Sequence, residues 1–313
     1  MKHAATDTIG SRCAVCKAEN GAGPASPWGE LYVRCASCGS LQRRESVTPQ
    51  RIDDWYDSRY RPSGGRYVSV WRLTRRLILR RIARHLDAVA PPGSIIDIGA
   101  GEGELALILL QRGRKCLALD PYSRTRHVTR KRLEDLETLD EASCLVYWHS
   151  FEHIVDPSTE VRAMARLLPV GGIVVMALPN PLSIQAWVFG DQWHGLDVGR
   201  HLHLASERGL LTLLETAGFR RADHVWRGGD AGQGFGGWMD GLLRLTGWRS
   251  GVHGLTLANG EVPLVRLLMG VCLAIGLAPL AAALSILEVL VGRPGTTVVL
   301  ARHTGAPSRA ESE

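Results

Sequence analysis

The sequence predicts an α/β protein built on a Rossmann-like, mainly parallel sheet. Its 313 residues, 45% hydrophobic and 22% charged, suit one or two packed domains and exclude a disordered chain or a mini-protein. Residues 94–98 form a short apolar strand that leads into the glycine-rich turn 99–103. A helical segment over 104–112 and a second strand over 115–119 follow. This strand–turn–helix–strand order is the repeating unit of open parallel sheets, so it predicts the fold class directly.

The N-terminal third carries the positive charge. Residues 1–90 contain 16 Lys and Arg but only 8 Asp and Glu, a net charge of +8. This segment is therefore more positive than the whole chain, whose net charge is +6. The chain does not open with the charged and apolar regions of a signal peptide, so we expect a cytoplasmic protein.

Four cysteines stand in two Cys-x-x-Cys pairs, Cys13 with Cys16 and Cys35 with Cys38. This spacing is typical of zinc ribbons, in which four thiolates close a tetrahedral site with no open position. The sequence therefore predicts a structural zinc ribbon over residues 1–45, held together by the metal instead of a hydrophobic core.

Residues 46–90 are interpreted as a basic helical connector. The predicted helix from Val68 to Leu86 carries six arginines on one side and apolar residues on the other. Either the arginines are a solvated face, or they attract the phosphates of lipid or nucleic acid.

The glycine turn Gly99-Ala100-Gly101-Glu102-Gly103 needs a ligand that tolerates acids. Glu104 takes the place of the last glycine of a dinucleotide motif, and two carboxylates would repel a pyrophosphate. A cationic, phosphate-free cofactor with a ribose fits better, because Asp120 can accept both ribose hydroxyls.

Several ordered segments resemble class I S-adenosylmethionine-dependent methyltransferases, in particular a ubiquinone-biosynthesis-like subgroup with an N-terminal zinc ribbon. They are DIGAGEG with LALD, EHIVDP at 152–157, LLPVGG at 167–172, RHLHLAS at 200–206 and LLETAGF at 213–219. The resemblance implies a seven-stranded sheet with an antiparallel last strand, formed by residues 91–227 and 295–304. It also implies S-adenosylmethionine as cofactor, bound by Asp97, Gly99, Ala100, Gly101, Gly103, Asp120 and His149.

The segment after Asp120 departs from the family pattern. Only 22 residues lie between Asp120 and the fourth strand near Ser143, so the second helix should be truncated or absent. Arg132 stands where the family has an acid for the adenine amino group, which leaves Asp135 or backbone groups as candidates.

Histidines supply the candidate bases for methyl transfer to a hydroxyl. His149 and His153 follow strand four at the carboxyl edge of the sheet, where ligands bind in such folds, and His201 and His203 should reach the same edge. We expect His153 or His201 to accept the substrate proton, with His149 nearby, and Asn180 to orient the substrate.

Residues 228–294 form an apolar insertion before the last strand. Leu267–Leu287 is a run of 21 residues without charge, but Pro279 should divide it into pieces too short to cross a bilayer. We expect a re-entrant or interfacial helical hairpin within 233–293. The alternative is a buried cap or a dimer interface. Residues 305–313 are expected to be a disordered tail.

Together these features predict a methyltransferase acting at the cytoplasmic membrane face on an apolar or lipid-linked small molecule. An RNA methyltransferase that docks through the ribbon and the arginine helix is the first alternative, although the insertion makes nucleic acid a poor partner. A non-catalytic binding module is the second.

Overall fold

The computed structural model describes residues 12–19, 31–44, 47, 52, 56, 68–198, 200–223, 231–248 and 264–305. The predicted tail beyond residue 305 lies outside the described residues.

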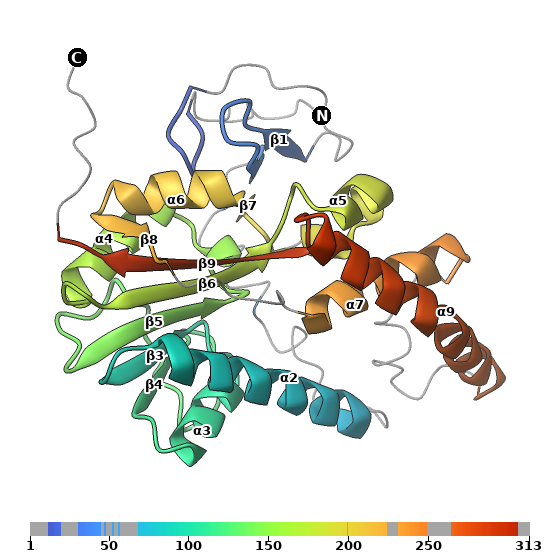
Figure 1. Cartoon of the computed structure of the whole chain (residues 1–313), viewed down its shortest axis with the longest axis horizontal. Helices are drawn as coiled ribbons and strands as arrows, with labels where there is room; N and C mark the ends of the chain where they lie inside the picture. Colours follow the sequence, from blue (N-terminus) through green and yellow to red (C-terminus); the bar gives the residue numbers. More distant parts are fainter. Residues whose placement is uncertain are drawn as a thin grey trace, which may run out of the picture.

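A six-stranded sheet in the order β4-β3-β5-β6-β9-β8 forms the centre of the protein (Figure 1). Parallel pairing joins β3 (Ser94–Ile98), β4 (Cys116–Leu119), β5 (Ala142–Trp148) and β6 (Ile173–Pro179). The last strand, β9 (Thr296–His303), runs antiparallel between β6 and β8 (Phe219–Arg221). Every residue of β6 is buried, as expected for a strand covered on both faces. The predicted α/β fold with an antiparallel last strand is therefore confirmed.

The predicted number of strands is wrong by one. Where the seventh strand was expected, the described chain between Asp120 and Ala142 has neither a strand nor a helix, and a single parallel bridge joins Leu119 to Thr129. The loop is held instead by Arg166, whose guanidinium donates to the carbonyl oxygens of Leu136 and Glu137. The 22-residue connection is too short for a helix and a full edge strand, so the predicted loss of the second helix is confirmed.

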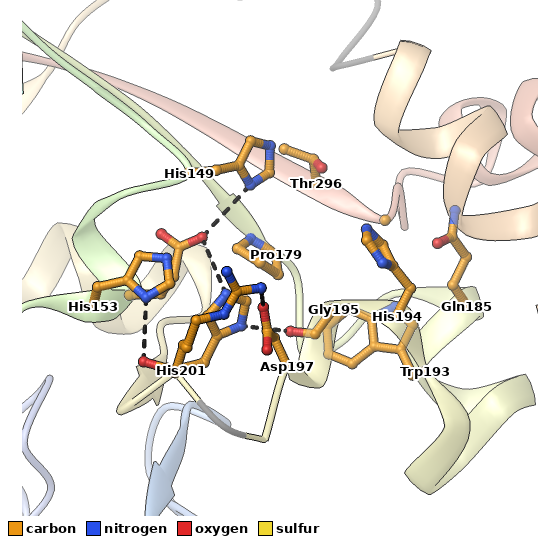
Figure 2. A pocket seen from close by; sticks show the side chains of 13 residues that line it. His149, His153, Pro179, Gln185, Trp193, His194, Gly195, Asp197, His201 and Thr296 are labelled. Carbon is orange, nitrogen blue, oxygen red and sulfur yellow. Dashed lines mark hydrogen bonds and ion pairs between the residues drawn. The ribbon is translucent and has the colours of Figure 1, made fainter. Parts of the chain in front are cut away.

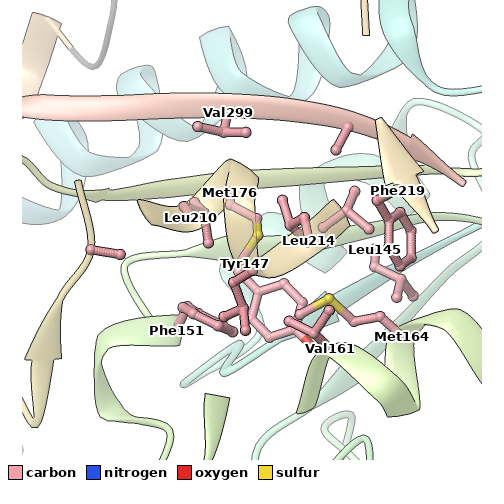
Figure 3. Close-up of a cluster of buried hydrophobic side chains, with 14 of the residues drawn as sticks. Leu145, Tyr147, Phe151, Val161, Met164, Met176, Leu210, Leu214, Phe219 and Val299 are labelled. Carbon is pink, nitrogen blue, oxygen red and sulfur yellow. The ribbon is translucent and has the colours of Figure 1, made fainter. Parts of the chain in front are cut away.

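Two helices cover each face of the sheet. One face is covered by α2 (Val68–Val89) and α3 (Glu104–Gln111), and the other by α4 (Pro157–Leu167) and α6 (Glu207–Glu215). Figure 3 shows the core under α4 and α6, where side chains from β5, β6 and β9 meet those of the helices. On α2, Leu79, Ile82 and Leu86 are buried against the sheet, while the described arginines face outward. The packing face of the predicted connector helix is thus confirmed.

The cysteine-containing segment is joined to the main domain by a strand. A small sheet contains β1 (Tyr32–Arg34), β2 (Leu41–Arg43) and β7 (His203–Leu204), and β7 comes from the main domain. Leu41 pairs with Leu204 and Gln42 with His203. The predicted boundary at residue 45 therefore separates two strands from the third strand that completes their sheet.

The apolar insertion forms a two-helix arm, α7 (Ala231–Leu245) and α9 (Leu264–Leu290), which projects past the end of the sheet (Figure 1). Its base packs on α5 (Ile184–Phe189), where Phe189, Trp238 and Ala281 are buried together. The prediction that Pro279 splits the apolar run is wrong, because α9 continues through it for 27 residues, about 40 Å. Pro279 removes one helical hydrogen bond, to the carbonyl of Ile275, and the remaining bonds hold the helix.

Candidate active site

The glycine turn, here called the glycine loop (Gly99–Gly103), connects the ends of three strands. Gly99, Gly101 and Gly103 have φ angles of +71°, +63° and +73°, which favour glycine. A Cβ on Gly99 would lie 2.3 Å from the Cβ of Ser150, which follows β5. The Gly101 amide donates to Asp120 Oδ2 at 2.8 Å, so the loop also binds the end of β4.

The predicted cofactor residues meet at this loop. Asp120 accepts backbone N–H groups of Gly101 and Tyr122, one on each carboxylate oxygen, and these bonds fix the carboxylate beside the loop. Asp97 is fully buried at the end of β3, and burial together with the charge of Asp120 raises its pKa to about 7. Glu104 turns toward Arg75 on α2, at 2.7 Å. These residues fit a phosphate-free adenosyl cofactor.

Asp135 lies apart from this group. Its exposed carboxylate accepts the backbone N–H of Arg132 at 3.0 Å and closes its own turn. Within the described chain Asp135 makes no hydrogen bond or ion pair to the glycine loop. An adenine contact through Asp135 stays a prediction.

A cavity of about 190 Å³, here called the histidine cavity, opens beyond the ends of β5 and β6 (Figure 2). Three predicted catalytic residues, His149, His153 and His201, line it. Other lining residues come from the segment 193–200 and from the start of β9. The sequence prediction that these three histidines share one edge of the sheet agrees with this geometry.

Glu152 lies at the centre of the three histidines. It sits in the 3₁₀ helix Phe151–His153, its relative exposure is 0%, and neither carboxylate oxygen accepts a hydrogen bond from the residues that the structure describes. Its Oε1 lies 3.6 Å from His149 Nδ1 and 3.8 Å from His201 Nε2. Burial alone would raise the pKa of Glu152, but the three imidazoles outweigh that effect and lower the pKa to about 2.

Backbone carbonyls fix the orientation of two of the rings. His201 Nδ1 lies 2.9 Å from the oxygen of Gly195, and His153 Nδ1 lies 3.2 Å from that of Arg200. A carbonyl cannot donate, so both Nδ1 atoms carry the proton and both neutral rings have their lone pair on Nε2. Burial lowers the pKa of His201 to about 4, so this ring is neutral at pH 7.

Asn180 and His203 do not line this cavity. The Asn180 amide donates to Pro294 O and accepts from Leu182 N. The side chain therefore connects the segment after β6 to the segment before β9. It lines a separate, more open depression with Arg293 and Thr297. His203 is buried and faces Ile154 O at 3.1 Å. The proposed substrate contact of Asn180 is therefore displaced from the histidines.

Sequence reasoning missed three features of the cavity. Glu152 is its central charge, Asp197 and Arg200 form an ion pair on its wall, and Gln185 lines it from α5. The available signal was the order His149, Glu152, His153, which places an acid between two candidate bases.

The four predicted metal ligands also converge. The Sγ atoms of Cys13 and Cys38 lie 4.0 Å apart and those of Cys16 and Cys35 lie 3.6 Å apart, and all four lie within 4.8 Å of one another. Thiolates bound at about 2.3 Å to a tetrahedral zinc ion would lie about 3.8 Å apart. The donor set therefore fits zinc.

Comparison with known proteins supports the assignment of the main domain. A family model described as "Methyltransferase domain" matches residues 70–223. An uncharacterized methyltransferase of Exiguobacterium sibiricum is 30% identical in an alignment 113 residues long, which covers 32% of this chain and 53% of the relative. The chain thus spans about half the length of that relative.

Solved structures show weaker likeness. The 1,6-didemethyltoxoflavin-N1-methyltransferase of Burkholderia thailandensis is 18% identical, with a TM-score of 0.42 over 59% of this chain and 86% of its own. The magnesium protoporphyrin IX methyltransferase of Synechocystis PCC 6803 is 16% identical, with a TM-score of 0.42 over 56% and 91%. The assignment rests on the family match and on the sheet order with its glycine loop. The family match over residues 70–223, together with the sheet order and the glycine loop, supports a methyltransferase domain in this part of the chain.

Proposed function

We propose that the protein transfers a methyl group from S-adenosylmethionine to a hydroxyl of an apolar or lipid-linked small molecule. The observation that carries the proposal is the juxtaposition of the glycine loop with the histidine cavity, since Ser150 packs on Gly99 and its neighbour His149 lines the cavity. The cofactor and the acceptor would then lie side by side at the carboxyl edge of the sheet.

The chain supplies positioning and proton transfer. Asp120 would hold the ribose. The amides of Gly99, Ala100 and Gly101 donate to the end of β4 and fix the shape of the loop, and Asp97 lies buried in β3 just before it. Bound S-adenosylmethionine supplies an electrophilic methyl group: the acceptor oxygen pair forms the new O–C bond, and the pair of the broken S–C bond stays on sulfur. The hydroxyl proton is removed by the cluster of Glu152 and its histidines.

The helical arm supports an apolar acceptor. Its α9 contains a segment, Leu268–Leu290, of 23 residues with mean hydropathy 2.2, of which 11% is buried. Val265, Ile275 and Ile286 are 69%, 68% and 62% exposed. An apolar surface of this length suits insertion into one leaflet of a bilayer or contact with a lipid. The base of the arm reaches the cavity, because Glu288 of α9 accepts from Gln185, which lines it.

Flotation with liposomes of anionic phospholipid tests the membrane contact. We expect the full-length protein to float with the vesicles, and the double variant Ile275→Glu, Ile286→Glu to remain in solution, because each charge must leave water on insertion. Leu77→Glu on α2 is the matched control, since Leu77 is 56% exposed on another element. Equal flotation of the double variant and the control would contradict the membrane contact.

The activity itself is tested with a series of para-alkylphenols of increasing chain length and radiolabelled S-adenosylmethionine. If the acceptor site is apolar, each buried methylene contributes about 0.8 kcal/mol, so kcat/KM should rise about fourfold per methylene until the site is filled. Binding of S-adenosylhomocysteine is measured by calorimetry on the same samples. No binding would contradict the methyltransferase activity and favour a non-catalytic module. Methylation of RNA but not of any phenol would favour the RNA alternative.

We also propose that Cys13, Cys16, Cys35 and Cys38 bind one structural zinc ion. Their spacing leaves no position for water, so the ion would stabilise the small sheet and take no part in methyl transfer. Its removal by a chelator should weaken the pairing of β2 with β7.

A further inference from the structure

Among the described residues, the carboxylate of Glu152 has no Lys or Arg partner and faces the imidazoles of His149 and His201, at 3.6 and 3.8 Å. The carboxylate is completely buried, and none of its oxygens accepts a hydrogen bond from the described residues. Transferring an ionised carboxylate out of water costs several kcal/mol unless a cation or strong donors compensate. The nearest cationic side chain on the cavity wall, Arg200, is paired with Asp197.

The histidines around Glu152 present lone pairs to it. Both His153 and His201 spend their Nδ1–H on a backbone carbonyl, so a neutral Nε2 of each is an acceptor. His201 Nε2 and Glu152 Oε1 therefore face each other as two acceptors, 3.8 Å apart. Two facing acceptors repel unless a cation lies between them. The rings of His153 and His201 lie next to each other, with their centroids 4.8 Å apart (Figure 2).

The spacing suits a metal ion. One donor atom from each of Glu152, His153 and His201 lies within 4.8 Å of the others. Ligand atoms about 2.1 Å from a tetrahedral ion lie about 3.4 Å apart, so the donor atoms would have to approach one another by up to about 1.4 Å to complete the coordination. Metal-bound histidines characteristically donate their second N–H to a backbone carbonyl or a carboxylate, as both rings do here.

We propose that Glu152, His153 and His201 bind a divalent first-row transition-metal ion. Two imidazoles and one carboxylate favour such an ion over Mg²⁺ or Ca²⁺, which prefer oxygen ligands throughout. Three protein ligands leave a position open toward the cavity, as in catalytic metal sites.

The role of the ion rests on the proposed function, although the site itself does not. An acceptor hydroxyl bound at the open position becomes more acidic, and its proton passes to His149, 3.6 Å from the same carboxylate oxygen. The oxygen pair then forms the bond to the methyl carbon. His153 and His201 act as ligands in this scheme, and the ion takes over the work expected of them as bases.

Titration with Co²⁺ of the full-length protein, with zinc already bound to the cysteines, tests the site. Tetrahedral or five-coordinate Co²⁺ absorbs in the visible, and thiolate ligands add a charge-transfer band that reports any exchange at the cysteines. We expect one equivalent to bind with a visible band and no thiolate band. Absence of that band, or a band with thiolate character only, would overturn the proposal.

The variants remove single donor atoms. His201→Asn and His153→Asn keep a donor for the backbone carbonyl but lack Nε2, and Glu152→Gln keeps the shape without the charge. Each should weaken Co²⁺ binding by about 100-fold or more. His203→Gln is the control: it replaces another buried histidine, and the glutamine amide can still donate to the carbonyl oxygen of Ile154. This variant should bind Co²⁺ like wild type. Unchanged affinity in Glu152→Gln, with a folded protein by circular dichroism, would overturn the proposal.

Binding of S-adenosylhomocysteine in the same samples separates the two proposals. Cobalt binding without S-adenosylhomocysteine binding would retain the metal site and reject the methyltransferase activity. The reverse result would reject the metal site alone.

Discussion

Gly99→Ala should disrupt the cofactor loop through two effects that the structure separates. The first is backbone strain, because a residue with a Cβ at φ +71° costs about 1–2 kcal/mol. The second is overlap, because the new Cβ would lie 2.3 Å from Ser150 Cβ, and relieving such a contact in a packed interior costs about 1–3 kcal/mol. The expected loss is therefore about 2–5 kcal/mol of unfolding free energy.

Gly113→Ala is the matched control for strain alone. Gly113 has φ +81°, but a Cβ there meets no atom within 4 Å. It should cost about 1–2 kcal/mol, reduced by the lower entropy of the unfolded chain.

Urea denaturation monitored by circular dichroism gives the two losses, and calorimetry gives the affinity for S-adenosylhomocysteine. We expect Gly99→Ala to lose more stability than Gly113→Ala and to bind the ligand at least tenfold more weakly. Adding Ser150→Gly to Gly99→Ala removes the overlap and should recover part of the lost stability. The recovery is incomplete because the double variant also loses the hydrogen bond from Ser150 Oγ to Ile98 O. Equal losses in the two alanine variants, with ligand affinity intact, would refute this account of the loop.

Three further predictions concern the core, the cysteines and the arm. Burial raises the pKa of Glu160 to about 7, from 4.5, so the wild type should lose up to about 3 kcal/mol of stability as pH rises from 4.5 through 7. Glu160→Gln should remove that loss in urea denaturation at pH 5 and 8, and a parallel pH dependence in both proteins would contradict it. Cys13→Ser should abolish zinc binding, measured by elemental analysis, and speed amide hydrogen exchange at β7. Cys272→Ser, at an exposed cysteine, should change neither. Slow exchange at β7 in the absence of zinc would contradict the link between the cysteine cluster and β7. Glu288→Leu should leave the buried donors of Trp238, Gln185 and Gly295 without an acceptor and lower the free energy of unfolding by about 3–6 kcal/mol. Glu288→Gln keeps an oxygen acceptor and should lower it less. Equal losses of the two variants in urea denaturation would show that these hydrogen bonds add little stability.

Local spacing allowed the most secure predictions from sequence. The glycine loop was predictable because its glycines and Asp120 sit at fixed distances along one strand–turn–helix–strand unit. The cysteine cluster was predictable because two short Cys-x-x-Cys turns each place two thiols on one side. Both depend on contacts between residues close in sequence or on a shared ligand.

Features that depend on long-range packing were less accessible. Pro279 predicts a break when α9 is considered alone, but Trp238 and Ala281 pack α7 against α9 and stabilise the helix across the proline. The missing strand has the same kind of cause. Thr129 forms one bridge to Leu119, and Arg166 on α4 holds the rest of the loop by hydrogen bonds. In both places tertiary contacts decide what local propensity leaves open.

The same long-range pairing ties the cysteine segment to residues that line the cavity. Tyr32 in β1 is buried, and its hydroxyl donates to the backbone carbonyl of His201 at 2.8 Å. Burial raises the pKa of Tyr32 to about 12, so the hydroxyl remains a donor at neutral pH. Ser206 adds a second tie, because its hydroxyl donates to Cys38 O at the cysteine cluster. Both ties hold residues 201–206, so a metal at the cysteines would fix the position of His201 relative to Glu152. A sequence scan treats the cysteines and the histidines as two separate sites. The pairing of β2 with β7 connects the segments that carry them, and the loss of a metal from either proposed site should therefore affect the other.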